Sequence, residues 1–146
     1  MKQLVNTVKQ ILDQKGRSVF TIEPDASVYD AIAMMAKKNV GALAVTDGGK
    51  LVGLISERDY ARKGFLQGCS SPDTKVSEIM SDCVMVVPPE RTTEECMALM
   101  TEKRFRHLPV VEDGDLVGMV SIGDMVKAII SEQRFTIEQL EHYITN

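Results

Sequence analysis

Short apolar runs alternate with polar turns along the chain, and the spacing of the apolar positions predicts both strands and helices. The runs over residues 19–22 (VFTI) and 84–87 (VMVV) are typical of buried strands. A proline follows each run two residues later, at Pro24 and Pro89, and ends it. Each run therefore predicts a short strand.

A helix is predicted after each of these strands. Ser27 with Asp30, and Thr92 with Glu95, have the Ser/Thr-x-x-acid spacing of a capping box. Behind each cap, side chains recur at helical spacing and form one stripe. The stripe of the first helix is Val28, Ala31, Ile32 and Met35, and that of the second is Thr93, Cys96, Met97 and Met100.

Two β-hairpins are predicted next. Each joins two apolar segments through a turn that contains glycine. The first hairpin combines ALAV (42–45), DGGK (47–50) and LVGLIS (51–56), and the second combines LPVV (108–111), EDGD (112–115) and LVGMVS (116–121). A further helix is expected from about residue 57 and from about residue 122, so each series of elements is β-α-β-β-α.

The two series are copies of one unit. A shift of 65 residues places Val19 on Val84, Leu43 on Leu108, Gly53 on Gly118 and Asp59 on Asp124 without a gap. A copy of about 60 residues buries too little surface to be robust alone. We therefore predict an α/β (α+β) fold in which two repeats, over 17–68 and 83–131, pack with pseudo-twofold symmetry. Residues 69–82 form a linker with a short helix.

Two helices are predicted outside the repeats. Over 1–16, Leu4, Val8, Ile11 and Leu12 form an apolar stripe that Gly16 ends. Over 132–146, apolar positions predict a separate C-terminal helix with Thr136 as a candidate N-cap.

Composition narrows the class of protein. A net charge of −4 disfavours a nucleic-acid binder, and no apolar run reaches the roughly 18 residues of a membrane span. The N-terminus lacks the apolar core of a signal peptide, so we expect a cytoplasmic protein. Cys69, Cys83 and Cys96 are odd in number and lack C-x-x-C spacing, which predicts reduced thiols rather than disulfides or a zinc site.

A Ser-x-x-Asp motif closes each hairpin, within GLISERD (53–59) and GMVSIGD (118–124). Its serines stand where a strand meets a helix N-terminus, and free N–H groups there favour an anion such as phosphate. Its aspartates carry two acceptor oxygens that match the two hydroxyls of a ribose. The same spacing suits a helix cap, so ligand contact and capping are both open interpretations.

The two motifs differ in the residues around them. Arg58 in the first is either a bidentate phosphate ligand or a surface arginine. Gly123 in the second would let the backbone approach a phosphate closely. Gly41 and Ala42, before the first hairpin, leave room for a base or a sugar. The helix after the first motif carries Tyr60, Arg62 and Lys63, which either contact a ligand or form a solvated face.

The duplicated β-α-β-β-α pattern, the stretch RHLPVVEDGDLVGMVSIGD and the paired Ser-x-x-Asp motifs closely resemble a tandem CBS-domain pair, or Bateman module. The resemblance covers residues 8–130, most of the chain. It implies adenosine-containing ligands in clefts between the repeats, regulation rather than catalysis, and a homodimer. It further implies that Arg106 and His107 point to the ligand phosphates, and that Lys15, Ser18, Phe20, Cys83 and Met85 line the adenine pocket.

Three functions follow as hypotheses. The first is a sensor of an adenine nucleotide, AMP before NAD or ATP, that regulates an unknown protein. The second is a ligand-free dimerisation or adaptor module. The third is an enzyme on nucleotides, which is disfavoured because the sequence has no Walker loop and only two histidines, His107 and His142. No catalytic residue, metal or catalytic cofactor is predicted.

Overall fold

The structure is a computed structural model that describes residues 5–82 and 84–145, so Leu4 and Cys83 lie outside the described residues. It divides into two compact units. The first unit is Val19–Met85, here called the 19–85 unit. The second combines Met1–Ser18 with Val86–Asn146 and is here called the terminal unit. Both units mix helices and strands, which confirms the predicted α+β class.

The 19–85 unit contains a three-stranded sheet in the order β1-β2-β3. β1 (Thr21–Ile22) is parallel to β2 (Ala42–Asp47), and β2 is antiparallel to β3 (Lys50–Ser56). The helices of this unit are α2 (Val28–Lys38), α3 (Glu57–Asp59), the π-helix η1 (Tyr60–Phe65) and α4 (Val76–Ile79). Side chains from α2, β2, β3 and α4 share one core that includes Val28, Met35, Leu43, Ile55 and Ile79.

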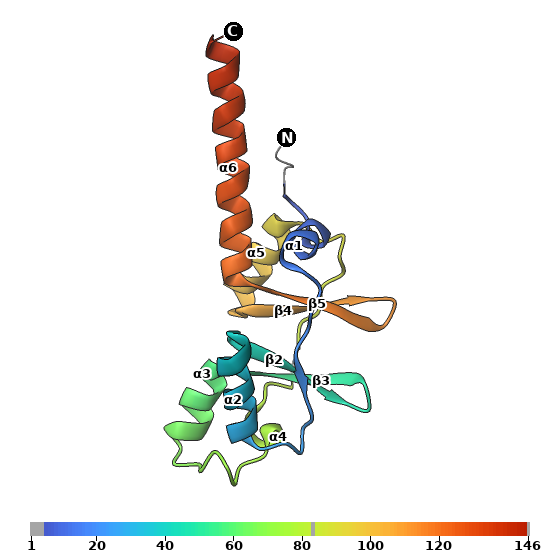
Figure 1. Cartoon of the computed structure of the whole chain (residues 1–146), viewed down its shortest axis with the longest axis vertical. Helices are drawn as coiled ribbons and strands as arrows, with labels where there is room; N and C mark the ends of the chain where they lie inside the picture. Colours follow the sequence, from blue (N-terminus) through green and yellow to red (C-terminus); the bar gives the residue numbers. More distant parts are fainter. Residues whose placement is uncertain (1–4, 83, 146) are drawn as a thin grey trace. The chain divides into compact units, whose positions relative to one another are not determined.

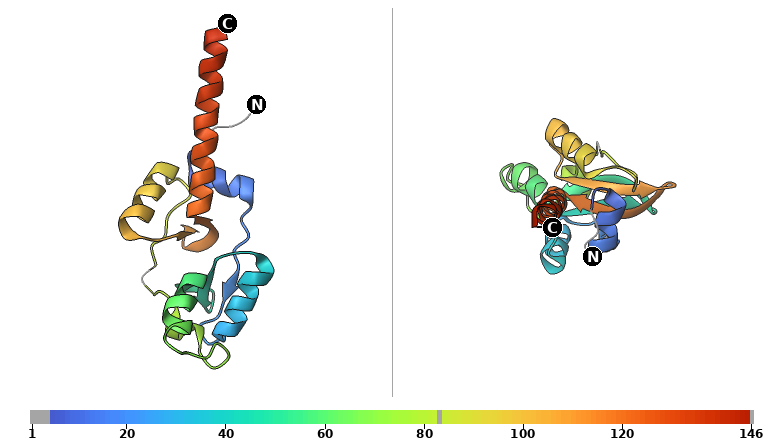
Figure 2. Two further views of the ribbon diagram at one scale, coloured as in Figure 1. Left: turned by 90° about the vertical axis from the view of Figure 1, so that its left-hand side faces the viewer. Right: turned by 90° about the horizontal axis from the view of Figure 1, so that it is seen from above.

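The terminal unit is built around the hairpin of β4 (His107–Glu112) and β5 (Asp115–Ser121). Its helices are α1 (Val8–Lys15), α5 (Thr93–Lys103) and α6 (Ile122–Thr145). Figure 1 shows α6 rising from the end of β5, and Figure 2 shows α1 and α5 on either side of its base.

The predicted strand over 84–87 is wrong except at Val87. Val87 forms one parallel bridge to Val110, with hydrogen bonds of 3.0 Å to the backbone of Pro109 and Val111. In the 19–85 unit, the Ala44 N–H donates to the Phe20 carbonyl and extends the pairing. Pro109 stands at the position equivalent to Ala44 and has no N–H, so the pairing cannot extend toward Met85.

The helix starts follow the sequence closely. Thr92 and Glu95 form the full reciprocal capping box, whereas Ser27 only accepts from the Asp30 N–H. The predicted stripes are buried, with Ile32 and Met97 half-buried at their edges.

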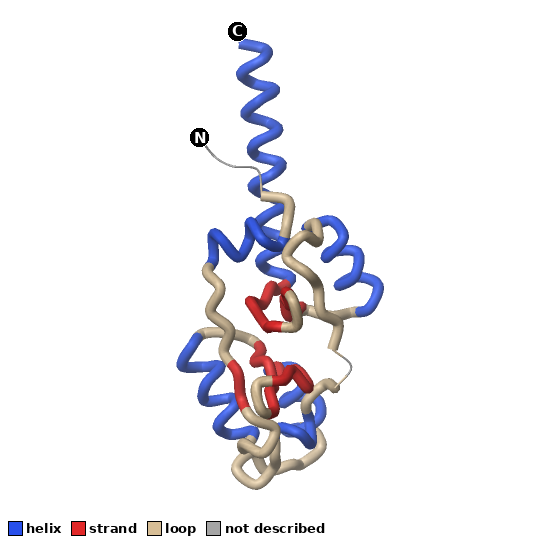
Figure 3. Tube along the Cα trace, turned by 90° about the vertical axis from the view of Figure 1, so that its right-hand side faces the viewer, coloured by secondary structure: helices blue, strands red, loops and turns tan. Residues whose placement is uncertain are grey.

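The predicted break at Thr136 is wrong, because α6 runs as one helix to Thr145 (Figure 3). The Thr136 hydroxyl donates to the Glu132 carbonyl one turn back at 3.1 Å and caps nothing. From Asp124 to Thr145 the sequence contains neither glycine nor proline, so no residue interrupts the helix.

In each unit, a helix or the residue just after it packs on the hairpin at a glycine. In the terminal unit, a Cβ at Gly118 would lie 2.6 Å from the Leu12 side chain of α1. In the 19–85 unit, a Cβ at Gly53 would lie 2.7 Å from the Met80 sulfur, just after α4. α1 therefore packs on the second hairpin at the position equivalent to that where α4 and Met80 pack on the first. The stripe predicted for α1 is buried at Val8, Ile11 and Leu12, and the helix ends at Gly16 as predicted.

Candidate functional site

The Ser-x-x-Asp motif forms a reciprocal cap in both units. In the 19–85 unit, the Ser56 N–H donates to Asp59 Oδ2 at 2.9 Å and the Asp59 N–H donates to Ser56 Oγ at 3.1 Å. In the terminal unit, the equivalent distances from Ser121 to Asp124 and back are 2.8 and 3.2 Å. The capping interpretation is therefore confirmed for both motifs.

The strand that enters each hairpin lies beside the motif. The Gly41 carbonyl accepts from the Glu57 N–H at 3.1 Å, and the Arg106 carbonyl accepts from the Ile122 N–H at 2.9 Å. Ala42 pairs with Ser56 and His107 pairs with Ser121 in the strand register. Each unit thus brings its predicted strand-entry residues to its own motif.

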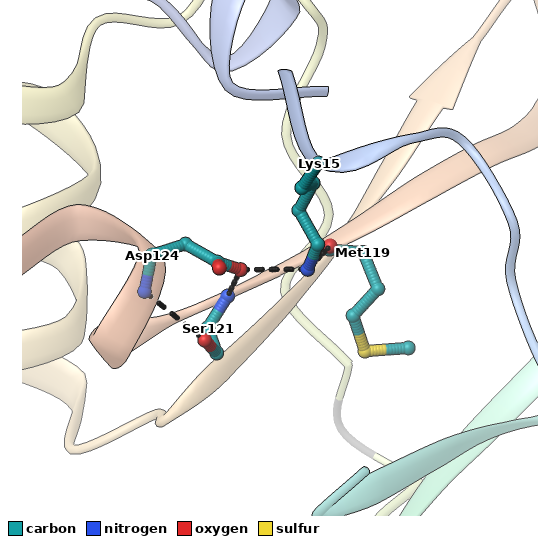
Figure 4. A network of polar contacts seen from close by, with 4 residues as sticks. All are labelled: Lys15, Met119, Ser121 and Asp124. Atoms are coloured by element: carbon teal, nitrogen blue, oxygen red, sulfur yellow. Dashed lines mark hydrogen bonds and ion pairs between the residues drawn. The ribbon is translucent and has the colours of Figure 1, made fainter. Parts of the chain in front are cut away.

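Lys15 joins the motif of the terminal unit, as Figure 4 shows. Its Nζ donates to Asp124 Oδ2 at 2.7 Å and to the Met119 carbonyl at 3.0 Å. The contact spans 109 residues of sequence and links the end of α1 to the start of α6. The Lys15 side chain is 41% exposed and that of Asp124 only 15%, so the carboxylate lies deeper than the ammonium.

Asp124 is held in its ionised form. Burial by itself would raise the pKa of this carboxyl group, but the hydrogen bonds and charge of Lys15, with the Ser121 hydrogen bonds, outweigh burial and lower the pKa below the usual 3.8. Within the part of the chain that the structure describes, the hydrogen bonds to Asp124 use Oδ2, which leaves Oδ1 to accept from a ligand.

The first motif has different cations near its carboxylate. Asp59 Oδ1 accepts from Ser81 Oγ at 3.4 Å and lies 3.8 Å from Lys63 Nζ. Lys63 is on η1, and π-helical segments often occur at functional sites. Arg58 is exposed on α3, one residue before Asp59.

Two residues implied by the resemblance lie apart from these contacts. Phe20 is half-buried beside β2, and Lys38 Nζ lies 5.3 Å from the centre of its ring. Met85 is half-buried in the segment after Cys83. Among the described residues, no hydrogen bond or ring contact connects either one to Ser56 or Asp59.

A pocket of about 220 Å³ opens between α1 and α6 at the Lys15–Asp124 pair. Ligand pockets are usually about 300–1,000 Å³, so this one is smaller than a typical ligand pocket. Sequence reasoning missed Lys127, although it follows Asp124 by three residues and so shares its helix face. The lining residues are Val5, Ile11, Gln14, Lys15, Asp124, Lys127, Ala128 and Ser131.

Residues 5–82 and 84–145 contain neither a membrane-spanning helix nor a metal-binding cluster. No helix in those ranges is both long and apolar enough to cross a bilayer. Over the same residues, His, Cys, Asp and Glu side chains form no group of three or more that would hold a metal ion.

Comparison with known proteins finds the CBS domain twice, over residues 8–64 and 76–131. The CBS domain-containing protein CBSX3, mitochondrial, of Arabidopsis thaliana is 42% identical over 147 residues, which cover 94% of this chain and 71% of that protein. The solved structure of a putative signal-transduction protein with CBS domains from Burkholderia ambifaria is 53% identical. It covers 87% of this chain and 96% of its own, with a TM-score of 0.84.

One of the solved relatives is in complex with adenosine compounds. The CBS domain pair of protein MJ0100, in complex with 5′-methylthioadenosine and S-adenosyl-L-methionine, is 26% identical to this chain with a TM-score of 0.78. The match covers 88% of this chain and 98% of that one.

Proposed function

Because the chain belongs to the CBS-domain family and carries two CBS domains in tandem, we propose that it is a regulatory module that binds an adenosine-containing ligand at its Ser-x-x-Asp motifs. Ligand binding changes the activity of a partner protein. The module acts as a homodimer in the cytoplasm and is not itself an enzyme. The relative in Arabidopsis carries "mitochondrial" in its name, so the cytoplasm stays a prediction.

The geometry of the motif carries this proposal. In each unit, an aspartate is fixed at a helix N-terminus by its own serine, at the end of a hairpin strand. Such a helix end attracts phosphate, and the carboxylate accepts from ribose hydroxyls. One motif therefore offers complementary groups for both the sugar and the phosphate of a nucleotide.

The second motif favours a ligand with phosphate. Lys15 Nζ contacts the Asp124 carboxylate. The Arg106 carbonyl accepts from the N–H of Ile122, and His107 lies opposite Ser121 in the strand register. A phosphate that contacts Arg106 and His107 leaves Asp124 Oδ1 for the sugar. AMP is the ligand proposed first, and NAD or ATP comes next.

A ligand-free adaptor is the second candidate function, and the caps support it. Both aspartates have a structural role without a ligand, since each satisfies a backbone N–H at a helix start. An adaptor would keep both motifs for stability alone.

A thermal-shift panel on the full chain separates the two candidates. A ligand at about 100 times its Kd stabilises a single site by roughly 2.7 kcal/mol, which raises Tm by about 5 °C or more. AMP, ADP, ATP, NAD and S-adenosylmethionine are tested, with ribose 5-phosphate and GMP as controls. A rise in Tm with an adenosine compound, but not with ribose 5-phosphate or GMP, supports the sensor. Unchanged Tm with all five at millimolar concentration supports the adaptor.

A further inference from the structure

Helix α6 has two apolar faces. One face packs onto its own unit through Met125 and Ala128, which are 0% and 5% exposed. At about 100° per residue, a second stripe lies about 130° around the helix from this buried face. Its members are Val126, Ile130, Ile137, Leu140 and Ile144, between 42% and 80% exposed.

The exposed stripe has the spacing of a coiled-coil seam. Ile130, Ile137 and Ile144 are seven residues apart, and Leu140 follows Ile137 by three. This is the a/d pattern that lets one helix pack against another along its length. A stripe that served only its own unit would end where the helix leaves it.

The most exposed part of the stripe lies beyond the rest of the terminal unit. Figure 1 and Figure 2 show α6 continuing past α1 and α5. Here Ile137, Leu140 and Ile144 are 54%, 57% and 80% exposed. Solvent-exposed aliphatic side chains in an ordered row are typical of a surface that binds another protein.

We propose that the distal half of α6, residues 133–144, pairs antiparallel with the same segment of a second copy of this chain. Ile137 of one copy packs on Leu140 of the other, and the twofold axis repeats this contact. Gln133 then lies opposite Ile144, at the ends of the paired segment.

The charges beside the stripe select the second copy and its direction. Arg134 and Glu141 lie on the same side of the stripe, seven residues apart, and both are exposed. When one helix is turned end for end, Arg134 of each copy lies beside Glu141 of the other, so two opposite-charge pairs form. In a parallel pair, Thr136 of one copy would lie beside Glu141 of the other, and neither ion pair would form.

Cysteine cross-linking tests the register. Cys69, Cys83 and Cys96 are first replaced, Cys69 and Cys83 by serine and the buried Cys96 by alanine. In the R134C/E141C variant we expect a covalent dimer on mild oxidation, because the two positions face each other between copies. Within one helix these positions are about 10 Å apart, which is too far for a disulfide. R134C alone and E141C alone stay monomeric on a denaturing gel, but a mixture of the two cross-links.

Charge reversal tests the pairing without cysteines. Sedimentation equilibrium should show weaker self-association for R134E and for E141R, and recovery in R134E/E141R. I137N/L140N should raise the dissociation constant of this association about 100-fold or more, because two apolar contacts are lost twice. The matched control is E138N/Q139N, which adds the same residues to the same turn outside the stripe and should leave the constant unchanged.

These outcomes are independent of nucleotide binding, since all of the measurements are made without ligand. No cross-link in R134C/E141C, or equal dissociation constants for I137N/L140N and E138N/Q139N, would overturn the proposal. If the protein cross-links but no adenosine compound changes its Tm, the sensor function is refuted and the proposed pairing is supported.

Discussion

The ammonium of Lys15 lies 2.7 Å from the carboxylate of Asp124, and this ion pair ties the end of α1 to the first turn of α6. The pair connects the helix that covers the second hairpin with the motif that ends it. A residue expected from family resemblance at a ligand pocket thus also stabilises its unit. Asp124 is therefore a structural residue of its unit as well as a proposed ligand residue.

Replacing Lys15 tests how this pair depends on pH. The folded-state pKa of Asp124 is lowered, so the carboxylate contributes stability above its ordinary pKa of 3.8, and this contribution is lost as the pH falls through the folded-state pKa. Because Lys15 is 41% exposed, we expect K15M to cost only about 0.5–1 kcal/mol at pH 7. Urea unfolding should show a larger loss at pH 7 than at pH 2.5. K9M is the control, because Lys9 is exposed on the same helix. A loss in K15M that is equal at both pH values contradicts this account.

Much of the fold was predictable from the sequence because its signals are local. The Thr92–Glu95 box, the buried stripes and the two glycine-containing turns each depend on a few neighbouring residues. The loss of the predicted strand over 84–87, which leaves only a bridge at Val87, was not predictable by the same reasoning. Its pairing fails at Pro109, on another strand, and a local apolar run carries no information about that partner.

The position of α1 was missed for a different reason. TVKQIL (7–12) resembles KVSEIM (75–80), but the offset between them is 68 residues rather than 65. A search at one fixed offset therefore places α1 outside the repeat. Allowing a three-residue gap pairs Val8 with Val76 and Ile11 with Ile79, all of which are buried. That alignment would have predicted that α1 covers a hairpin as α4 does, and would have placed Lys15 near the second motif.

The described cysteines should differ sharply in reactivity. Cys69 is exposed, whereas Cys96 is buried on α5 and burial raises its thiol pKa to about 11. Since the thiolate is the reactive form, a disulfide reagent at pH 8 should label Cys69 rapidly and Cys96 only on unfolding. Labelling is measured by mass spectrometry on a C83S background.

Because the folded-state pKa of Cys96 is raised, the stability due to its neutral thiol is present below pH 9 and is lost as the pH rises through 11. Equal labelling of both thiols in the folded chain would show that α5 opens readily.

Gly123 separates the two roles of the second motif. A Cβ there would lie 3.6 Å from Ser121 Oγ, an ordinary contact, and the backbone φ is not in the left-handed region. G123A should therefore raise the free energy of unfolding by about 0.5–1 kcal/mol, because alanine favours a helix. If a phosphate approaches this backbone, the added methyl group weakens AMP binding about tenfold in calorimetry. R58A, at the equivalent position of the first motif, tests separately whether that motif contacts the phosphate. Greater stability with unchanged affinity would place the phosphate elsewhere.

The paired substitutions D124A and D59A distinguish a ligand site from a cap. Each removes a reciprocal cap, so each should cost about 1–2 kcal/mol of folding free energy, and D124A also leaves Lys15 without its carboxylate. If Asp124 also accepts from ribose hydroxyls, its loss removes charged hydrogen bonds worth about 1.5–3 kcal/mol and weakens AMP roughly 10- to 150-fold. Calorimetry at fixed salt, at a temperature where both variants remain folded, measures this.

We expect the larger loss of AMP affinity in D124A, because Arg106 and His107 lie beside its motif while Gly41 and Ala42 lie beside the other. Reduced stability with unchanged affinity in both variants would leave the motifs as helix caps and favour the adaptor. Equal losses of affinity would mean that the two motifs bind the ligand alike, contrary to the difference in their cations.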